Sequence, residues 1–296
     1  MELCFTPPHD FVMGIRGGPI LPPNIVTGAE FDAGLADQPS RYVLVYRPLT
    51  PSGQKVALVA ALYGLLDVVT VIAPDNGRLT ASPGGELSWS PNLTAEQRKA
   101  VEVGGSVRSP VLVDVPSMRV LTNDPYRMPY AFRELAAPRA DGGERLLSTH
   151  RVGAAERQWD SRIFHELHAG VYRAGFLDSQ DEYRLAVDGV HRFLSDLDER
   201  LAGSRFLHGD ALVPSDLWLF SLLVRFDQVY GPGFRLHRYR LRDYGNVWRY
   251  LRELYRIPAC SFTTDFDAIS AGYFVGISAL NRGIVPIGPD DLFLRD

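Results

Sequence analysis

Apolar runs and helical spacings divide the chain into two regions of different character. In the first region, β-branched and aromatic runs predict four strands, at residues 41–46, 68–74, 109–115 and 119–123. Apolar residues at helical spacing predict a helix between the first two strands, ending near Gly64, and another from Pro125 to about Ala136. The order strand, helix, strand implies a parallel pair joined by a right-handed crossover.

From residue 151 onward the pattern is helical throughout. Four long helical segments are predicted, at residues 155–176, 181–203, 215–230 and 244–257. We therefore expect an α/β plus all-α fold class, with an α/β domain at residues 41–140 and an all-helical domain at 151–296. Residues 1–40 are rich in glycine and proline and have no sustained period, so they are expected to form an extended arm that packs on the domains.

The segment between the second and third predicted strands, residues 76–108, is unusually long for a connection in a compact domain. We expect it to be an insertion with a purpose. A lid and a mobile surface loop are both open interpretations.

Composition narrows the class of protein. The chain has 296 residues, 46% of them hydrophobic, which is enough for a substantial core. The formal net charge is only −4, so neither nucleic acid nor an anionic membrane is expected as a partner. Two cysteines are too few for a disulfide framework, and no apolar run is long enough to span a bilayer. The N-terminal residues do not read as a secretory signal, and we expect a cytoplasmic protein.

Several stretches of the sequence, in order and at similar spacing, resemble one family. They are RYVLVYRPLTPSGQKVALVAALYGL, GVYRAGF, LVRFDQVY, LRDYGNVWRYLRELYRIP and GIVPIGP, which together cover nearly everything from residue 41 onward. The chain resembles the Xi class of glutathione transferases, the glutathionyl-hydroquinone reductases. The resemblance implies a thioredoxin-like domain followed by an all-helical glutathione-transferase domain. It also implies glutathione or another small thiol as cofactor, a small aromatic or conjugated carbonyl substrate, and a homodimer.

Thr50 stands where the family has its catalytic cysteine. The family's Cys-Pro-Trp-Ala falls on Thr50, Pro51, Ser52 and Gly53. A hydroxyl cannot form the mixed disulfide of the reductase reaction, so Cys-dependent reductase activity is not expected. Thr-Pro is also what helix N-capping selects. The functional alternative is a hydroxyl that hydrogen-bonds a bound thiolate, with Ser52 as a second candidate.

Neither cysteine of the chain falls on that motif. Cys4 lies in the expected arm and Cys260 follows a C-terminal helix, and both are expected to be structural.

The resemblance also implies thiol-binding positions. The family's Val-Pro, in which the proline is commonly cis, falls on Ser109 and Pro110. The family's Glu-Ser, which holds the γ-glutamyl end of glutathione, falls on Asp124 and Pro125. Asp-Pro also suits a helix start, with the aspartate as N-cap, so a purely structural role is equally open.

The resemblance also implies two substrate-binding tyrosines. The family's tyrosines that face the quinone oxygens fall on Tyr172 and Tyr273, and the histidine before the second falls on Gly272. A phenol can donate a hydrogen bond to a carbonyl oxygen or to an enolate forming from it. A core role is the alternative for either tyrosine.

His168 and Asp216 are two further candidates. His168 lies four residues before Tyr172, so both share a helix face and His168 can contact the substrate. The surrounding HELH does not have the spacing of a zinc motif, and no metal is expected. VPSDLWLF resembles the helix-start motif of transferases, and Asp216 is expected to serve folding rather than chemistry.

Two function hypotheses follow. The first is a glutathione-transferase-like enzyme that acts on a hydrophobic quinone-like or conjugated carbonyl compound by thiol addition, elimination, isomerisation or cyclisation. The second is a non-catalytic ligand-binding or chaperone-like protein on a transferase scaffold that has lost its cysteine and tryptophan. Titration with glutathione and a naphthoquinone, together with Tyr→Phe variants, separates them.

Overall fold

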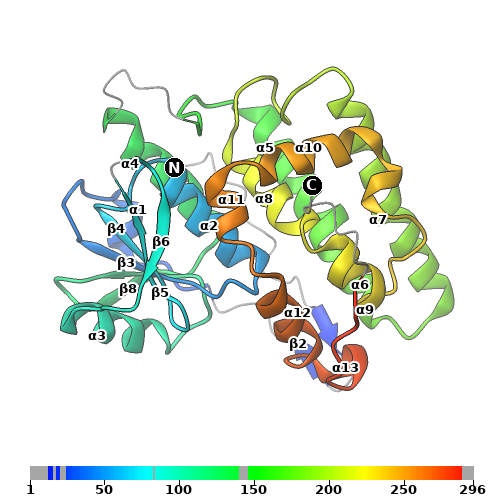
Figure 1. The fold of residues 1–296 in the computed structure, drawn as a ribbon, viewed down its shortest axis with the longest axis horizontal. Helices are drawn as coiled ribbons and strands as arrows, with labels where there is room; N and C mark the ends of the chain where they lie inside the picture. Colours follow the sequence, from blue (N-terminus) through cyan, green and yellow to red (C-terminus); the bar gives the residue numbers. More distant parts are fainter. Residues whose placement is uncertain (1–12, 16–17, 21–24, 83, 140–145, 289–296) are drawn as a thin grey trace. The chain divides into compact units, whose positions relative to one another are not determined.

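The computed structural model describes residues 13–15, 18–20, 25–82, 84–139 and 146–288 (Figure 1). Its contacts divide the chain into two compact units. The described residues from 25 to 151 form the first unit, and those from 152 onward, with residues 13–15 and 18–20, form the second. Within these residues no helix has both the length and the apolar character that a membrane crossing requires.

The first unit is built on a six-stranded mixed sheet with the strand order β6-β5-β4-β3-β7-β8. The strands are β3 (Tyr42–Val45), β4 (Val69–Ala73), β5 (Gly77–Ala81), β6 (Leu87–Ser90), β7 (Val111–Asp114) and β8 (Arg119–Thr122). β3 pairs in parallel with β4 and antiparallel with β7. The predicted parallel pair around the first helix is thus confirmed.

Helices cover this sheet. They are α1 (Ala29–Asp32), α2 (Pro51–Leu62), α3 (Ala95–Gly104), α4 (Met128–Ala136) and the short 3₁₀ helix η1 (Ala137–Arg139). Ala100 of α3 packs on Val43, Val45 and Val113, so α3 covers one face. Successive strand residues point to opposite faces, so the fully buried Leu44 faces away from α3. α2 and α4 pack against each other.

The expectation for residues 76–108 was wrong. The segment is neither a loop nor a lid, because it contains β5, β6 and α3. β5 and β6 are short and largely polar, so their composition does not predict strands; they pair as an antiparallel ladder in which the Thr80 and Ser88 hydroxyl oxygens lie 2.8 Å apart. α3 had a readable start, since Thr94 and Gln97 form a capping box.

The expected arm, residues 1–40, is described only in part. β1 (Met13–Ile15) and β2 (Gly18–Ile20) form an antiparallel hairpin. Further on, Thr27 bridges to Thr122, and the Val26 backbone N–H donates to the Asn123 side chain at 2.7 Å. This part of the arm therefore extends the edge of the sheet beside β8. The arm also contains α1, and its residues 1–12, 16–17 and 21–24 lie outside the described ranges.

From residue 152 onward the second unit is helical, and the four predicted helices are confirmed. Its elements are α5 (Ala154–Arg162), η2 (Ile163–His168), α6 (Ala169–Phe176), α7 (Gln180–Leu201), α8 (Pro214–Leu223), η3 (Phe226–Tyr230), α9 (Gly231–Gly233), η4 (Leu241–Asp243), α10 (Gly245–Tyr255), α11 (Pro258–Phe262), α12 (Phe266–Phe274) and α13 (Ser278–Asn281). Two predicted helices contain π-helical segments. η2 leads into α6, and η3 follows α8.

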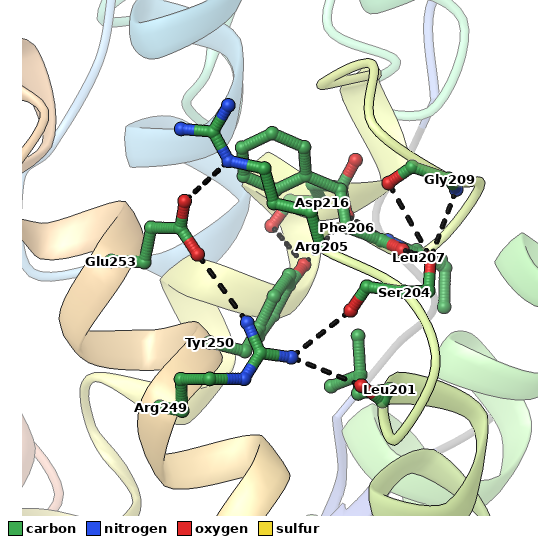
Figure 2. A network of polar contacts seen from close by, with 10 residues as sticks. All are labelled: Leu201, Ser204, Arg205, Phe206, Leu207, Gly209, Asp216, Arg249, Tyr250 and Glu253. Atoms are coloured by element: carbon green, nitrogen blue, oxygen red, sulfur yellow. Dashed lines mark hydrogen bonds and ion pairs between the residues drawn. The ribbon is translucent and has the colours of Figure 1, made fainter.

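A buried carboxylate organises the start of α8 (Figure 2). Asp216 accepts hydrogen bonds from the backbone N–H groups of Val213 at 2.9 Å and Leu207 at 2.8 Å. It also accepts one from the hydroxyl of Tyr250 on α10 at 2.8 Å. Burial raises the pKa of Asp216 to about 6, against the effect of these hydrogen bonds. Asp216 ties α8 to α10 and to the preceding loop, which is the folding role expected of it.

Candidate functional site

Thr50 is the N-cap of α2. Its hydroxyl oxygen accepts a hydrogen bond from the backbone N–H of Gly53 at 3.2 Å and donates to the carbonyl oxygen of Arg47 at 3.0 Å. The expected capping role of Thr50 is therefore confirmed. A side chain at Gly53 would be crowded, since its Cβ would lie 2.7 Å from the Thr50 hydroxyl oxygen. Ser52, the second candidate, is half-buried in the first turn of the same helix.

Ser109 and Pro110 lie just before β7, and the peptide bond between them is cis. Pro110 is buried. The Ser109 hydroxyl oxygen is shielded from solvent and makes no hydrogen bond within the described part of the chain. A shielded hydroxyl without a partner is unusual, because such groups normally find one.

Asp124 follows β8 and is almost completely buried. Its Oδ1 accepts hydrogen bonds from the backbone N–H groups of Tyr126 at 2.9 Å and Arg127 at 3.2 Å. Burial raises its pKa, while these hydrogen bonds and the charge of Lys55 lower it. Asp124 therefore stabilises a turn, and α4 begins at Met128 rather than at the predicted Pro125.

These residues can be tested against the needs of glutathione. A peptide ligand needs polar groups that are not fully used by the protein itself. Ser109 provides one such hydroxyl. Asp124 provides another group, since both of its hydrogen bonds to described residues use Oδ1 and leave Oδ2. Asp124 and Ser109 therefore each keep a polar side-chain atom that the described residues do not use.

Cys260 does not supply the sulfur that Thr50 lacks. It lies in α11 of the second unit and is fully buried. Burial raises the pKa of its thiol, so the thiolate is disfavoured. These properties match the expected structural role. Cys4 lies outside the described residues.

In the second unit, three tyrosine hydroxyls are linked to one another by consecutive hydrogen bonds. The hydroxyl oxygens of Tyr172 on α6 and Tyr273 on α12 are 3.3 Å apart. Tyr273 also lies 3.2 Å from the hydroxyl oxygen of Tyr230, at the end of η3. Tyr273 is thus the middle member, Tyr230 is the fully buried end, and Tyr172 is half-buried. We call these three residues the tyrosine cluster.

The ring of Phe234 packs against all three members of the tyrosine cluster. Its centroid lies 5.2 Å from that of Tyr172, 5.4 Å from that of Tyr230 and 5.8 Å from that of Tyr273, each in an edge-on arrangement. Gly175 makes this possible, because a Cβ there would lie 2.4 Å from a carbon of the Phe234 ring.

Burial keeps the tyrosine cluster protonated. It raises the pKa of Tyr172 and of Tyr273 well above the ordinary value, and it also raises the pKa of Tyr230. The charge of Arg225 lowers all three, which only partly offsets the effect of burial. The cluster therefore offers hydrogen-bond donors rather than bases.

His168 lies next to the tyrosine cluster, as its spacing predicted. Its ring centroid is 5.7 Å from that of Tyr172. Its neighbour Glu166 instead binds Arg162 through a 2.8 Å ion pair on the outside of the helix. Of the HELH residues, His168 thus lies beside the cluster.

The sequence interpretation missed Tyr230 and Arg225. Both lie in LVRFDQVY, which carried the family resemblance, but a single tyrosine or arginine in a helical pattern gives no sign of a third hydroxyl partner. The nearby π-helices were the missing indication, since π-helical turns are frequent at functional sites. Helical spacing alone does not reveal them.

Comparison with known proteins gives relatives over most of the chain. No family model matches it. The chain is 30% identical over 276 residues to a glutathionyl-hydroquinone reductase of Sphingobium chlorophenolicum, covering 87% of this chain and 86% of the relative. It is 34% identical over 190 residues to a glutathionyl-hydroquinone reductase of Escherichia coli, covering 62% of this chain. That match spans 56% of the Escherichia coli protein, somewhat over half of its length.

Solved structures give the same result. The glutathione-bound structure of a glutathione transferase homologue from Escherichia coli superposes with a TM-score of 0.71 at 26% identity, covering 85% of each chain. The Xi glutathione transferase of Phanerochaete chrysosporium gives 0.69 at 26% identity, covering 87% of this chain and 92% of that one. The predicted thioredoxin-like domain followed by a helical transferase domain is thereby confirmed. The chain belongs to the family of glutathionyl-hydroquinone reductases, the Xi class of glutathione transferases.

Proposed function

We propose that this protein is a glutathione-transferase-like enzyme whose tyrosine cluster binds and polarises the oxygen of a hydrophobic quinone-like or conjugated carbonyl compound. The observation that carries the proposal is the chain of hydroxyls from Tyr230 through Tyr273 to Tyr172, with oxygen separations of 3.2 and 3.3 Å.

The number of hydroxyl protons in the tyrosine cluster supports its role as a hydrogen-bond donor to a ligand. Three phenols carry three hydroxyl protons, and two of them suffice for the two internal hydrogen bonds. When Tyr230 donates to Tyr273 and Tyr273 donates to Tyr172, the proton of Tyr172 remains for a ligand. Tyr172 is also the cluster member with solvent exposure. Donors in a chain polarise one another, which strengthens the last hydrogen bond.

The raised pKa values of the tyrosines determine which reactions the cluster can assist. Phenols that stay protonated cannot remove a proton from a substrate, but they stabilise negative charge that develops on its oxygen. Thiol addition, elimination, isomerisation and cyclisation of a conjugated carbonyl compound all develop such charge. His168, next to Tyr172, is our candidate for a further substrate contact.

We assign the thiol to the first unit. In thiol addition the sulfur bonds to a substrate carbon, and the thiol proton ends on the substrate oxygen. Thr50 would rotate its hydroxyl proton from the Arg47 carbonyl toward the sulfur, because its acceptor side already holds the Gly53 N–H. Ser52 is the alternative hydroxyl, and Ser109 and Asp124 would bind the rest of the thiol. Cys-dependent reductase activity is not part of this proposal.

One observation favours the competing function, a ligand-binding protein without catalysis. The Thr50 hydroxyl donates to the Arg47 carbonyl oxygen and accepts the Gly53 N–H at the start of α2, so it has a structural reason to be present. Under this alternative the tyrosine cluster binds the carbonyl compound, and no thiol reacts with it.

Purified protein with glutathione and a naphthoquinone tests both functions. We expect formation of the thioether, with kcat/KM lowered roughly ten- to a hundredfold by Tyr172→Phe or Tyr273→Phe. Tyr255→Phe removes a phenol of α10 outside the cluster and serves as the matched control. Binding without turnover would support the ligand-binding alternative. Full activity in both cluster variants would reject the proposed role of the tyrosines, and rapid glutathionyl-hydroquinone reduction would reject the assignment away from reductase chemistry.

A further inference from the structure

Lys55 is a buried lysine in the helix that Thr50 caps. It lies in α2, and only 2% of its surface is exposed. Its Nζ lies 4.6 Å from the centroid of the Tyr126 ring, over the face of that ring. Burying a charge is costly unless other groups balance it, so a negative group is expected in the surroundings of Lys55.

Asp124 is a negative group that Tyr126 connects to Lys55. Asp124 is 1% exposed, and its Oδ1 accepts the backbone N–H of Tyr126 at 2.9 Å. Tyr126 thus contacts both charges, Lys55 through its ring and Asp124 through its backbone. Burial raises the pKa of Asp124, and its backbone hydrogen bonds and the charge of Lys55 oppose this effect. Lys55 therefore supports the carboxylate both by its contact with the turn and by its charge.

Arg127 is a second cation near Asp124, but an acid outside this turn balances it. Its guanidinium forms an ion pair with Asp32 of α1 at 2.5 Å, and the Asp32 side chain is half exposed. Glu30, also on α1, pairs with Arg119 of β8 at 3.0 Å, and both side chains are exposed. These two pairs are therefore surface interactions, whereas Lys55 is buried beside the turn of Asp124.

The unused oxygen of Asp124 determines which ligand group it can bind. An ionised carboxylate accepts hydrogen bonds and donates none. Described residues use Oδ1 and leave Oδ2, so a ligand at Oδ2 must bring a donor, and the ammonium group is the strongest donor of a small peptide thiol. We propose that Lys55 is a positioning residue of the thiol site, which holds the Asp124 carboxylate through Tyr126 and thereby makes the site prefer thiols with a free amino group. This inference rests on the proposed function, in which Asp124 binds part of the thiol.

A purely structural role for Lys55 predicts a different pattern of binding. α2 and α4 pack against each other, and in that role Lys55 serves only the contact between α2 and the turn before α4. Its loss would then weaken all thiol ligands alike, because the whole turn would move. The preference between two thiols that differ only at the amino group is therefore the decisive measurement.

Two matched thiols test the proposal with the wild-type protein. They are glutathione and glutathione acetylated on its amino group, which keeps the sulfur and both carboxylates but has no ammonium group. Isothermal titration calorimetry at neutral pH gives the two dissociation constants. We expect glutathione to bind about tenfold more tightly, as one charge-assisted hydrogen bond predicts. Equal affinities for the two thiols would overturn the proposal.

Lys55 variants identify the source of the preference. Lys55→Met removes the charge but keeps an unbranched side chain, and it should bring the affinities for the two thiols close together. Lys55→Arg keeps a cation for the Tyr126 ring and should retain most of the preference. Lys99→Met, which removes an exposed lysine of α3, is the matched control and should keep the wild-type preference. A wild-type preference in Lys55→Met would overturn the proposal.

Circular dichroism checks the fold of each variant. If Lys55→Met does not fold, Tyr126→Leu decides, because it removes the ring and leaves both Lys55 and the backbone N–H that Asp124 accepts. We expect Tyr126→Leu to lower the preference for glutathione over its acetylated form. An unchanged preference in that variant would show that the contact between Lys55 and Tyr126 does not position Asp124.

The outcomes separate this inference from the proposed function. If the wild-type protein binds neither thiol, the assignment of the thiol to the first unit fails, and the role of Lys55 fails with it. If the protein binds both thiols equally, forms the thioether and loses activity in Tyr172→Phe, the proposed function stands and the role of Lys55 does not.

Discussion

The hydroxyl oxygens of Tyr172 and Tyr273 lie 3.3 Å apart, although 101 positions separate the two residues in the chain. One belongs to α6 and the other to α12, so their contact depends on the packing of the second unit. Tyr273 continues the chain of hydroxyls to Tyr230. The properties of the site are therefore those of three residues acting together, and they can be changed by substitutions at residues that need not touch a ligand.

Tyr230→Phe tests the buried end of the hydroxyl chain. The change removes the hydroxyl that supports Tyr273, so the donor strength of Tyr172 should fall although Tyr172 is intact. A buried hydrogen bond contributes about 1 kcal/mol, which predicts a roughly fivefold loss of kcat/KM or ligand affinity. Unchanged kinetics with a lowered melting temperature would show that Tyr230 serves only packing.

Thr50→Ala tests the N-cap of α2. Losing the cap should lower the free energy of unfolding by about 0.5–2 kcal/mol, and Thr50→Ser should retain most of it. Thr94→Ala, at the equivalent position of α3, is a matched cap deletion away from the motif. Urea unfolding measures both. If Thr50 also orients a thiol, Thr50→Ala raises the KM for glutathione and Thr94→Ala does not; equal KM values would leave Thr50 with its structural role alone.

Asp216 should give the stability of the protein a distinct pH dependence. Its pKa is about 6 in the folded state against 3.8 ordinarily, so the folded state binds the proton more tightly. The stability that this proton provides is complete below about pH 4 and is lost as the pH rises to 6. Each pKa unit corresponds to about 1.4 kcal/mol, so the change approaches about 3 kcal/mol.

Asp216→Asn isolates this effect, because an amide does not titrate. The variant should be less stable at every pH, since asparagine cannot accept all three hydrogen bonds. Its deficit relative to wild type should shrink as the pH rises from 4 to 6. Urea unfolding at a series of pH values measures the difference, and a constant deficit would contradict the raised pKa.

Gly175→Ala tests the packing beneath the tyrosine cluster. The added methyl would lie 2.4 Å from a carbon of the Phe234 ring, so that ring must shift, and it contacts all three tyrosines. We expect loss of ligand affinity and a lower melting temperature. Gly189→Ala in α7 is the control, because no atom lies within 4 Å of its added methyl. It should stabilise the protein by about 0.5–1 kcal/mol. Equal behaviour of the two variants would contradict the steric argument.

Structural features that are determined by residues close together in the sequence could be predicted from it. Val43 and Val45 belong to an apolar run that predicted a strand, and Thr50 followed by Pro51 predicted a helix cap. The polar strands β5 and β6 could not be recognised, because their pairing is set by the neighbouring β4 rather than by their own composition. The pairing of Tyr172 and Tyr273 was not predictable for the same reason, and only the family resemblance connected them.

The homodimer implied by the family resemblance stays a prediction. So do the roles of Thr50, Ser52, Ser109 and Asp124 toward a thiol.

The two π-helical segments make the tyrosine cluster sensitive to chain length. In an α-helix each residue advances the rotation by about 100°, and a π-helical turn accommodates one residue more than an α-helical turn. η2 determines the direction in which the Tyr172 side chain leaves α6, and η3 determines the direction of the Tyr230 side chain. Deleting a single residue from either segment would restore ordinary winding and aim that hydroxyl about a quarter-turn or more away from Tyr273. Relatives that lack such a residue would keep the same helices and lose the hydroxyl chain.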